Sequence, residues 1–428
     1  MRFAPKLVTA AVLLATASGA IAAPTYIHAG RLIAVPGQAV RGPSTVIVDG
    51  DRIVAVRDGL VPPPAGTALI DLGDRTVLPG LIDSHVHLSS DRGGEAGLLS
   101  FFREEPQMNA LEAQMNGMKT LRAGFTTVRN LGDEGATLAL REAIKRGWVQ
   151  GPRIVDAASS ISTTGGHMDG RGGLNDDLVA HLPSPENLCD GVDSCRKVVR
   201  RQIDRGADVI KFATTGGVNS GTGLATRMNE DEARALIDTA HAYGRKVAVH
   251  AHGADGIKLA LRAGADSIEH GTVMDDEILR TMRKQGTYYV PTLSTVNGYL
   301  ERLAANPNAY APDVKKQIDW RIGITGQSLA KAVPAGVRIA FGTDAGVSKH
   351  GRNADEFELM VKHGMSPVEA IKAATVNAAD LLGLSSEVGT IEAGKSADLI
   401  AVGGDPLTDV RVLKSVGFVM ARGAVVSR

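Results

Sequence analysis

The chain of 428 residues is poor in several residue types, and each shortage narrows what the protein can be. Aromatic residues make up only 4% of it, which gives no sign of a stacking cleft. Cysteine occurs twice, at Cys189 and Cys195, and the spacing is not that of a zinc-binding pair. In an exported chain these two residues can close a short disulfide loop, and two free thiols are the alternative.

The sequence also lacks an excess of charge, with 47 basic and 47 acidic residues. Such a balance provides no basic field for nucleic acid or for an anionic membrane surface. Beyond the first 22 residues, no apolar run is long enough to cross a bilayer. Nucleic acid and membrane are therefore not expected as partners.

The first 22 residues have the layout of a secretory signal peptide. Arg2 and Lys6 precede an apolar stretch, and Ala20-Ile21-Ala22 offers small residues for cleavage. An uncleaved anchor is the alternative. We expect cleavage after Ala22 and a periplasmic or secreted protein. Removing this segment leaves 45 basic residues against 47 acidic ones, a formal charge near −2.

The remainder of the chain is longer than one simple hydrophobic core usually holds, and it divides into three zones. Residues 23–77 alternate β-branched and polar positions around an Asp49-Gly50-Asp51 hairpin turn. Residues 78–387 repeat a strand, loop and helix pattern, with eight candidate strands, the number that closes a parallel barrel. Residues 388–428 return to β alternation. This order predicts an α/β protein, a (β/α)8 barrel with a small β domain built from both termini.

Six dispersed polar residues stand at the ends of apolar runs within the barrel zone. They are His85, His87, Lys211, His250, His270 and Asp344. Buried strands do not normally end in ionisable side chains, and a barrel brings its strand ends together at one mouth. On a strand, His85 and His87 point to the same face, so both can hold one metal ion. The pattern predicts a metal site in which Asp344 can also accept a proton.

Lys211 is the most unusual of the six, because Val209-Ile210-Lys211-Phe212 places an amine in an apolar strand. Burial there favours the neutral amine over ammonium. A neutral amine reacts with CO2 to give a carbamate, whose two oxygens can bridge a pair of cations. An isolated lysine of this kind more often reaches solvent or pairs with an acid. The five companion residues favour the carboxylated form.

Taken together, these features resemble the amidohydrolase superfamily over nearly the whole mature chain. The resemblance rests on the ordered set of six residues and on the flanking text Leu78-Pro-Gly-Leu-Ile-Asp-Ser-His-Val-His87, Ile268-Glu-His-Gly271 and Gly389-Thr-Ile-Glu-Ala-Gly-Lys-Ser-Ala-Asp-Leu399. It implies a TIM barrel with a β-sandwich and a site for two divalent cations, with zinc as the expectation. In that site His85 and His87 hold the more buried ion, His250 and His270 hold the other, carboxylated Lys211 bridges them, and Asp344 lies near the attacking water.

Three further motifs resemble the branch of metal-dependent carboxypeptidases and dipeptidases that includes ochratoxin-hydrolysing amidohydrolases, with imidazolonepropionase-like and Xaa-Pro dipeptidase-like relatives. They are Thr163-Thr-Gly-Gly-His167, Lys211-Phe-Ala-Thr-Thr-Gly-Gly-Val218 and Val249-His-Ala-His-Gly253. The resemblance implies hydrolysis of an amide or dipeptide substrate with a free carboxylate, including conversion of ochratoxin A to ochratoxin alpha and phenylalanine. We expect His252, His167 and Arg227, which follow strands, to bind that carboxylate.

Two alternatives keep the same fold. A deaminase or cyclic-amide hydrolase of the imidazolonepropionase kind is disfavoured, since deaminases of this superfamily generally lack the bridging lysine. A non-catalytic binding relative is disfavoured because none of the six residues is missing. Relatives of this kind commonly assemble, so we also expect a homo-oligomer, with an octamer as one form.

Overall fold

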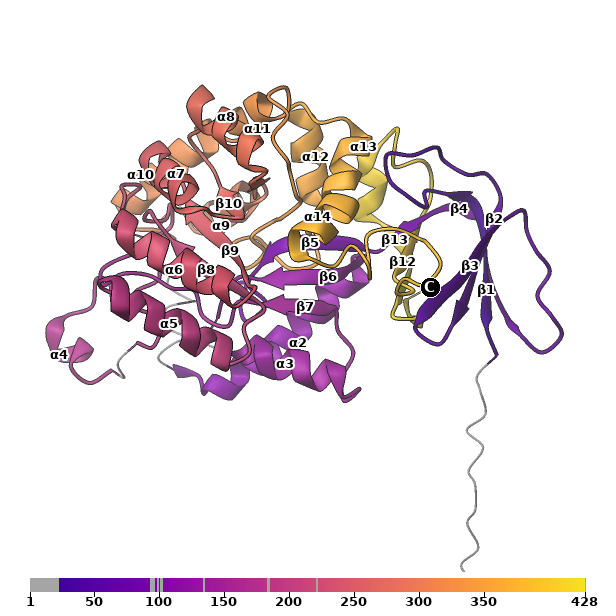
Figure 1. Cartoon of the computed structure of the whole chain (residues 1–428), viewed down its shortest axis with the longest axis horizontal. Coiled ribbons are helices and arrows are strands. Elements are labelled where there is room, and N and C mark those ends of the chain that lie inside the picture. The colour runs from indigo at the N-terminus through magenta and orange to yellow at the C-terminus, as the bar shows by residue number, and fades with distance from the viewer. Residues whose placement is uncertain are drawn as a thin grey trace, which may run out of the picture.

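The computed structural model describes residues 23–92, 97, 100, 103–133, 135–182, 185–220 and 222–427. The predicted signal peptide, residues 1–22, lies outside the described residues. Figure 1 shows a body of strands surrounded by helices, with a separate sheet at one end that contains both ends of the described chain. Across all of these residues, no helix is both long and apolar enough to cross a membrane.

The sheet at the end of the molecule combines strands from both termini. Its strands are β1 (Thr25–Leu32), β2 (Ser44–Asp49), β3 (Arg52–Asp58), β4 (Ala68–Pro79), β12 (Leu399–Val402), β13 (Val416–Ala421) and β14 (Ala424–Ser427). They are ordered β14-β13-β12-β4-β1-β2-β3. The predicted hairpin is the antiparallel pair β2–β3. The antiparallel pair β12–β4 joins the two ends of the chain, as the alternation at both termini predicts.

The body contains two sheets whose strands are all parallel. One has the order β5-β6-β7 and the other β11-β10-β9-β8. The strands are β5 (Leu81–Val86), β6 (Phe125–Asn130), β7 (Arg153–Asp156), β8 (Val209–Ala213), β9 (Lys246–Ala251), β10 (Ser267–His270) and β11 (Tyr288–Val290). Strands β5, β6, β8 and β10 are buried along their whole length, including their polar residues, as expected for parallel strands covered on both faces.

One of the eight candidate strands predicted in the barrel zone, the apolar run at 338–341, does not form a regular strand. It makes a single parallel bridge, Tyr289↔Ile339. Its main-chain groups are shared between neighbours, since Ala340 N donates to Tyr289 O at 3.0 Å and Ser84 N donates to Phe341 O at 2.8 Å. Phe341 N donates instead to Ala373 O, at 3.0 Å, which breaks the ladder.

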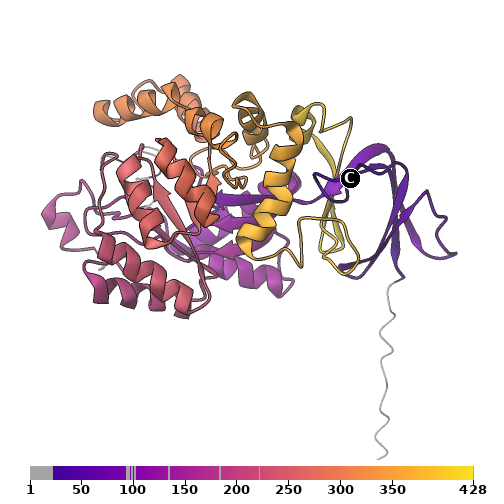
Figure 2. The ribbon, with the colours of Figure 1, turned by 45° about the horizontal axis from the view of Figure 1, so that its top comes forward.

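Helices cover the parallel strands on the outside (Figures 1 and 2). They are α2 (Pro106–Arg122), α3 (Ala136–Lys145), α4 (Asp176–Val179), α5 (Val192–Asp204), α6 (Glu230–Ala242), α7 (Ala254–Ala263), α8 (Asp276–Gln285), α9 (Thr295–Ala305), α10 (Pro312–Gly323), α11 (Gln327–Ala332), α12 (Asp355–Lys362), α13 (Pro367–Lys372) and α14 (Ala378–Leu382). A capping box of Asn229 and Glu232 begins α6, satisfying free main-chain N–H groups. Helices α2, α3, α6, α7 and α14 pack directly against strands of the body, whereas α4 has no buried residue.

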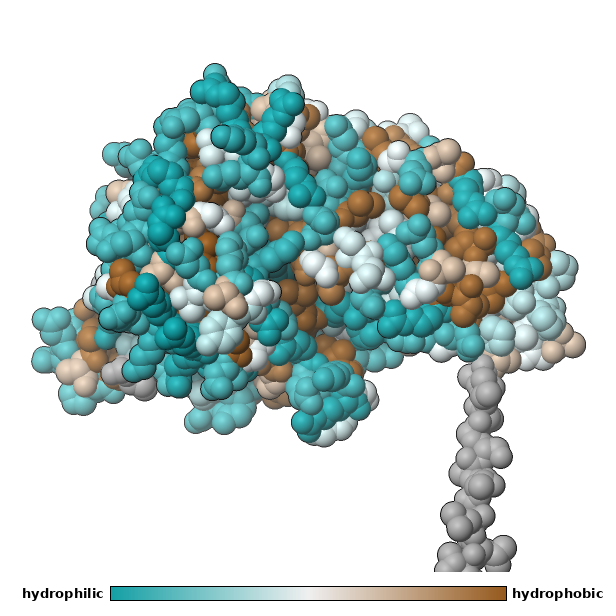
Figure 3. All heavy atoms as spheres, viewed as in Figure 1, coloured by the Kyte–Doolittle hydropathy of each residue, from teal (hydrophilic) through white to brown (hydrophobic). Residues whose placement is uncertain are grey.

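The surface differs between the body and the terminal sheet. Figure 3 shows a mainly hydrophilic face over the helices and hydrophobic side chains gathered over the terminal sheet. Val54 of β3 and Leu69 of β4 are among the exposed apolar residues of that sheet.

Candidate active site

The six residues predicted to bind metal line one cavity of about 350 Å³. His85, Lys211, His250 and His270 lie on β5, β8, β9 and β10, and all four are buried. His87 follows β5 and is partly exposed, and Asp344 is buried in the segment after Phe341. Adjacent parallel strands run in one direction, so their carboxyl ends converge on this cavity. The structure therefore brings together all six residues.

A first cluster joins His85, His87 and Asp344, whose ligand atoms lie within 4.8 Å of one another. Asp344 Oδ1 is 3.5 Å from His85 Nε2 and 3.3 Å from His87 Nε2. Burial alone would raise the pKa of Asp344, but the two imidazoles and the Lys211 amine outweigh it and lower that pKa to about 2. The carboxylate is ionised at neutral pH, and the cluster has the donors of a metal site.

The main chain holds Asp344 close to β5 in an unusual conformation. Asp344 has φ of 57°, in the left-handed region, and its N–H donates to His85 O at 2.7 Å. The carboxylate of buried Asp83 links the two segments. It accepts one hydrogen bond from Thr343 Oγ1 at 2.6 Å and another from His85 N at 3.1 Å. Asn353 Nδ2 also donates to it, at 2.7 Å. These contacts set the spacing between His85 and Asp344.

Lys211 extends from β8 into the centre of the site. Its Nζ is 3.4 Å from His85 Nε2, and the side chain is only 1% exposed. Burial lowers the pKa of the amine to about 8, against the opposing pull of Glu269 and Asp344. A fraction of the amine is therefore neutral near pH 7, the form that carbamate formation requires.

A second cluster consists of His250, His252 and His270, whose ligand atoms also lie within 4.8 Å of one another. The ring centroids of His250 and His270 are 4.6 Å apart, and those of His252 and His270 are 4.8 Å apart. Burial and the neighbouring imidazoles hold the pKa values of His250 and His270 well below the usual range. His252, expected to bind substrate, thus lies among the candidate metal ligands. Neutral imidazole is the form that binds a metal.

The candidate ligands are oriented by partners on their other ring nitrogen. His85 Nδ1 is 2.8 Å from Glu269 Oε2, and His270 Nδ1 is 2.8 Å from Thr292 Oγ1. His87 Nδ1 is 2.8 Å from the carbonyl of Gly132. Such contacts direct the remaining nitrogen of each ring to the cavity and are typical of metal-binding histidines. The donor set of this chain therefore fits divalent cations.

Glu269 belongs to the site although the sequence assigned it no role. It is fully buried and also accepts from Arg129 Nη2 at 2.8 Å. Burial would raise its pKa, but Arg129 and His85 outweigh that effect and lower it to about 2. The signal was present in the sequence, because Glu269 stands inside the quoted Ile268-Glu-His-Gly271 motif. Its partner Arg129 gave no comparable signal.

The structure treats the two remaining candidates for substrate binding differently. His167 lines the cavity, and its ring stacks on that of His250 with centroids 4.2 Å apart. Arg227 is exposed and does not line this cavity. Its guanidinium donates to the carbonyl of Thr222. The structure therefore does not bring Arg227 to the six residues.

A buried arginine that sequence reasoning missed does line the cavity. Arg321 of α10 is 3% exposed, and its Nη1 donates to Thr325 Oγ1 at 3.1 Å. Within the described part of the chain it forms no ion pair, and burial lowers its pKa. Tyr299 and Arg302 of α9 join the same wall. No local pattern marks these three residues, which come to the site only through the packing of α9 and α10.

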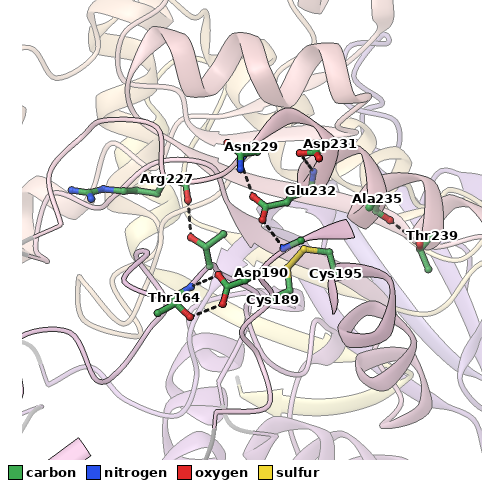
Figure 4. The surroundings of a disulfide bond; sticks show 12 residues. Thr164, Cys189, Asp190, Cys195, Arg227, Asn229, Asp231, Glu232, Ala235 and Thr239 are labelled. Atoms are coloured by element: carbon green, nitrogen blue, oxygen red, sulfur yellow. Dashed lines mark hydrogen bonds between the residues drawn. A yellow bond between two sulfur atoms is a disulfide. The ribbon is translucent and has the colours of Figure 1, made fainter. Parts of the chain in front are cut away.

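Cys189 and Cys195, left open between a disulfide and two thiols, form a disulfide. Figure 4 shows it joining the start of α5 to the segment that contains Asp190. That segment is bonded to the loop before His167, since Thr164 Oγ1 donates to Asp190 Oδ2 at 2.7 Å. The disulfide thus fixes a segment that braces one side of the site.

Known proteins share this arrangement of the chain. The model of the family described as the Amidohydrolase family matches residues 76–426. A solved Xaa-Pro dipeptidase with methionine bound in its active site is 40% identical, with a TM-score of 0.89 over 94% of this chain and 99% of that structure. Ochratoxinase of Aspergillus niger is 30% identical over 408 residues, covering 91% of this chain and 83% of that protein. Imidazolonepropionase of Fusobacterium nucleatum is 24% identical over 397 residues, or 83% of each chain.

The chain therefore belongs to the amidohydrolase family and is a hydrolase acting on C–N bonds. The resemblance to this family that the sequence indicated is confirmed. The α/β fold is confirmed as well, through relatives of the same fold that match along nearly the whole chain.

Proposed function

We propose that this protein is a binuclear metal-dependent hydrolase that releases a C-terminal amino acid from an N-acyl amino acid or dipeptide. The observation that carries the proposal is Lys211, whose buried amine stands beside His85 in the cavity that also holds the second histidine cluster. A carbamate on Lys211 would bridge two cations. His85, His87 and Asp344 would hold one, and His250 with His270 the other.

Zinc ions bound there would lower the pKa of a bound water and polarise the scissile carbonyl. The chain's own residues supply the proton transfers. Asp344, with its pKa near 2, is ionised at neutral pH and accepts the proton of the attacking water. It then donates that proton to the departing amine. Burial of the site keeps bulk water from competing for these transfers.

The free carboxylate of the leaving amino acid would be bound by Arg321, with His252 and His167 close by. Among the described residues no carboxylate pairs with the buried Arg321, and an incoming carboxylate would supply that partner. The similar Xaa-Pro dipeptidase with bound methionine supports an amino-acid subsite here. The similarity to ochratoxinase supports ochratoxin A as one substrate, cleaved to ochratoxin alpha and phenylalanine.

A direct test uses N-acyl amino acids and dipeptides that differ in the C-terminal residue, with and without a chelator. We expect two metal ions per chain, release of the free amino acid, and loss of turnover on chelation. Lys211→Ala should lose turnover and recover part of it with a short carboxylate such as formate. One metal ion with release of ammonia would instead establish the deaminase alternative, and ring opening of a cyclic amide without any released amine would establish the cyclic-amide alternative.

The proposal extends to the architecture around the site. We propose that the segment 338–345 completes an eight-stranded barrel, supported by its hydrogen bonds to Tyr289 and Ser84. Residues 23–77 and 388–428 would form a β-sandwich beside a catalytic domain of residues 78–387. Residues 1–22 would be removed on export to the periplasm or medium, and the mature chains would assemble into a homo-oligomer. Mass spectrometry and light scattering of protein from the native host would check the last two points.

A further inference from the structure

A second cavity, of about 490 Å³, lies beside the active-site cavity. The two share four wall residues, which are His87, Gly132, Asp133 and Met168. The two cavities are therefore adjacent at His87. The catalytic centre thus has room on two sides, and the two sides differ in chemistry.

One side offers a positive charge. Arg321 and His252 line the active-site cavity and do not line the second one. The second cavity combines the apolar wall residues Met168, Leu182 and Pro185 with four charged ones, which are Asp133, Arg171, Glu186 and Arg205. A substrate with its carboxylate at Arg321 would direct its acyl group towards the second cavity, because the scissile bond must lie between them at the clusters.

The charged groups in the wall of the second cavity already have partners. Glu186 pairs with Arg201, and Arg205 Nη1 donates to Ser159 Oγ at 3.1 Å. Asp133 Oδ1 accepts from Gly135 N at 2.8 Å, and its Oδ2 accepts from Asn130 Nδ2 at 3.3 Å. Arg171 pairs with Asp169, with Nε donating to Oδ1 at 3.1 Å. A wall whose polar groups are satisfied does not call for an ammonium or a second carboxylate on the ligand.

The wall is also held in place before any ligand binds. Asn187 Nδ2 donates to Ser160 O at 2.8 Å and to Met168 O at 3.0 Å. Two residues further along, the disulfide of Cys189 anchors the same segment to α5. A preformed cavity binds without the cost of ordering its walls.

We propose that the second cavity is the subsite for the acyl side of the substrate and that it takes bulky, uncharged acyl groups, aromatic ones in particular. A cavity of about 150 Å³ already holds benzene. The space beside His87 is larger, so it accommodates more than one ring. This subsite rests on the proposed function, because it gives a binding place to the acyl group of a substrate whose carboxylate is bound at Arg321. It favours N-aroyl amino acids over N-acetyl amino acids.

Substitutions that fill the second cavity test the subsite. Leu182→Trp and Ser159→Trp add bulk from two parts of its wall. Leu178→Trp is the matched control, since Leu178 lies on α4, is 39% exposed and does not line the cavity. The measurement is kcat/KM for N-(2-naphthoyl)-phenylalanine divided by that for N-acetyl-phenylalanine. We expect this ratio to fall at least about tenfold in both filled variants and to stay unchanged in the control.

Equilibrium dialysis of 2-naphthamide against metal-free protein gives a readout that needs no turnover. We expect binding to the wild type and the control, and its loss in the filled variants. Binding that persists in both folded, filled variants, or a ratio that does not change, would overturn the subsite while leaving the hydrolase intact. If the wild type cleaves no N-acyl amino acid but the binding pattern holds, the proposed function fails, and the second cavity remains a binding site for bulky uncharged groups without a role as an acyl subsite.

Discussion

The two histidine clusters differ in the charge that each brings to the site. The first contains Asp344 and has the buried carboxylate of Glu269 directly behind His85. The second consists of three imidazoles, and His270 is backed by a neutral hydroxyl, that of Thr292. Two cations bound side by side repel each other, and the first cluster is the better equipped to hold one.

Because the two clusters differ in charge, the chemical form of Lys211 affects them differently. As an ammonium it would repel a cation bound at His85, 3.4 Å from its Nζ. As a carbamate it would add negative charge between a cluster that has a carboxylate and one that has none. The second cluster should therefore depend on Lys211 more than the first.

Asp344→Asn removes the only carboxylate of the first cluster while keeping its size. We expect kcat to fall by roughly a thousandfold, because the proton acceptor is lost. The metal content of the protein, measured by elemental analysis, should fall from two ions towards one. Retention of full activity with two ions would contradict the role of Asp344.

Arg321→Met tests the charge that faces the second cluster. We expect KM for substrates with a free carboxylate to rise about a hundredfold with a smaller change in kcat, because a buried charged partner is lost. The same substrates with an amidated C-terminus provide the control. Wild type and variant should bind these equally poorly, and an equal loss on both substrate sets would show a merely structural role.

Glu269→Gln and Thr292→Val compare the residues that orient the histidines in the two clusters. We expect metal affinity to fall about 10- to 100-fold for Glu269→Gln, since a charged partner is replaced by a neutral one. The loss for Thr292→Val should be smaller, because a neutral hydroxyl is removed. Competition with a chromophoric chelator measures both. Thermal unfolding of each apoprotein separates lost affinity from lost stability, which matters because Arg129 also pairs with Glu269.

The last prediction concerns stability rather than activity, and it involves the acidic pair Asp133 and Asp156. Burial and the neighbouring Asp133 raise the pKa of Asp156 to about 7, so its protonated form is favoured in the folded state. Protonation stabilises the fold fully below pH 4, and the stabilisation is lost as pH rises towards 7. The free energy of unfolding should fall by up to about 1.4 kcal/mol per pH unit in that range.

Asp156→Asn should flatten this pH dependence, because the amide cannot ionise while its oxygen can still accept from Ala158 N. Urea unfolding of the apoprotein between pH 4.5 and 7.5 measures the difference. The same slope in wild type and variant would show that the pair does not titrate in this range.

The six candidate ligands could be read from the sequence because strands impose a simple rule. A polar residue that ends an apolar parallel strand must lie at the mouth of its sheet, whatever its distance in sequence. Residues 338–341 bring Asp344 to the same site although they form no regular strand, since Phe341 N donates to Ala373 O and the regular ladder is lost. The rule gave no information on Arg227, which no strand constrains.

The sequence by itself determined the family and the six dispersed residues at the ends of apolar runs, because periodicity and motif are local properties. Only the tertiary structure decided which residues surround them. Arg321 reaches the cavity from a helix far along the chain, and Asp83 holds Thr343 across 260 positions. The pairing of Cys189 with Cys195 and the second cavity beside His87 were also decided there. Contacts of this kind depend on how whole elements pack, and no local pattern of residues encodes that packing.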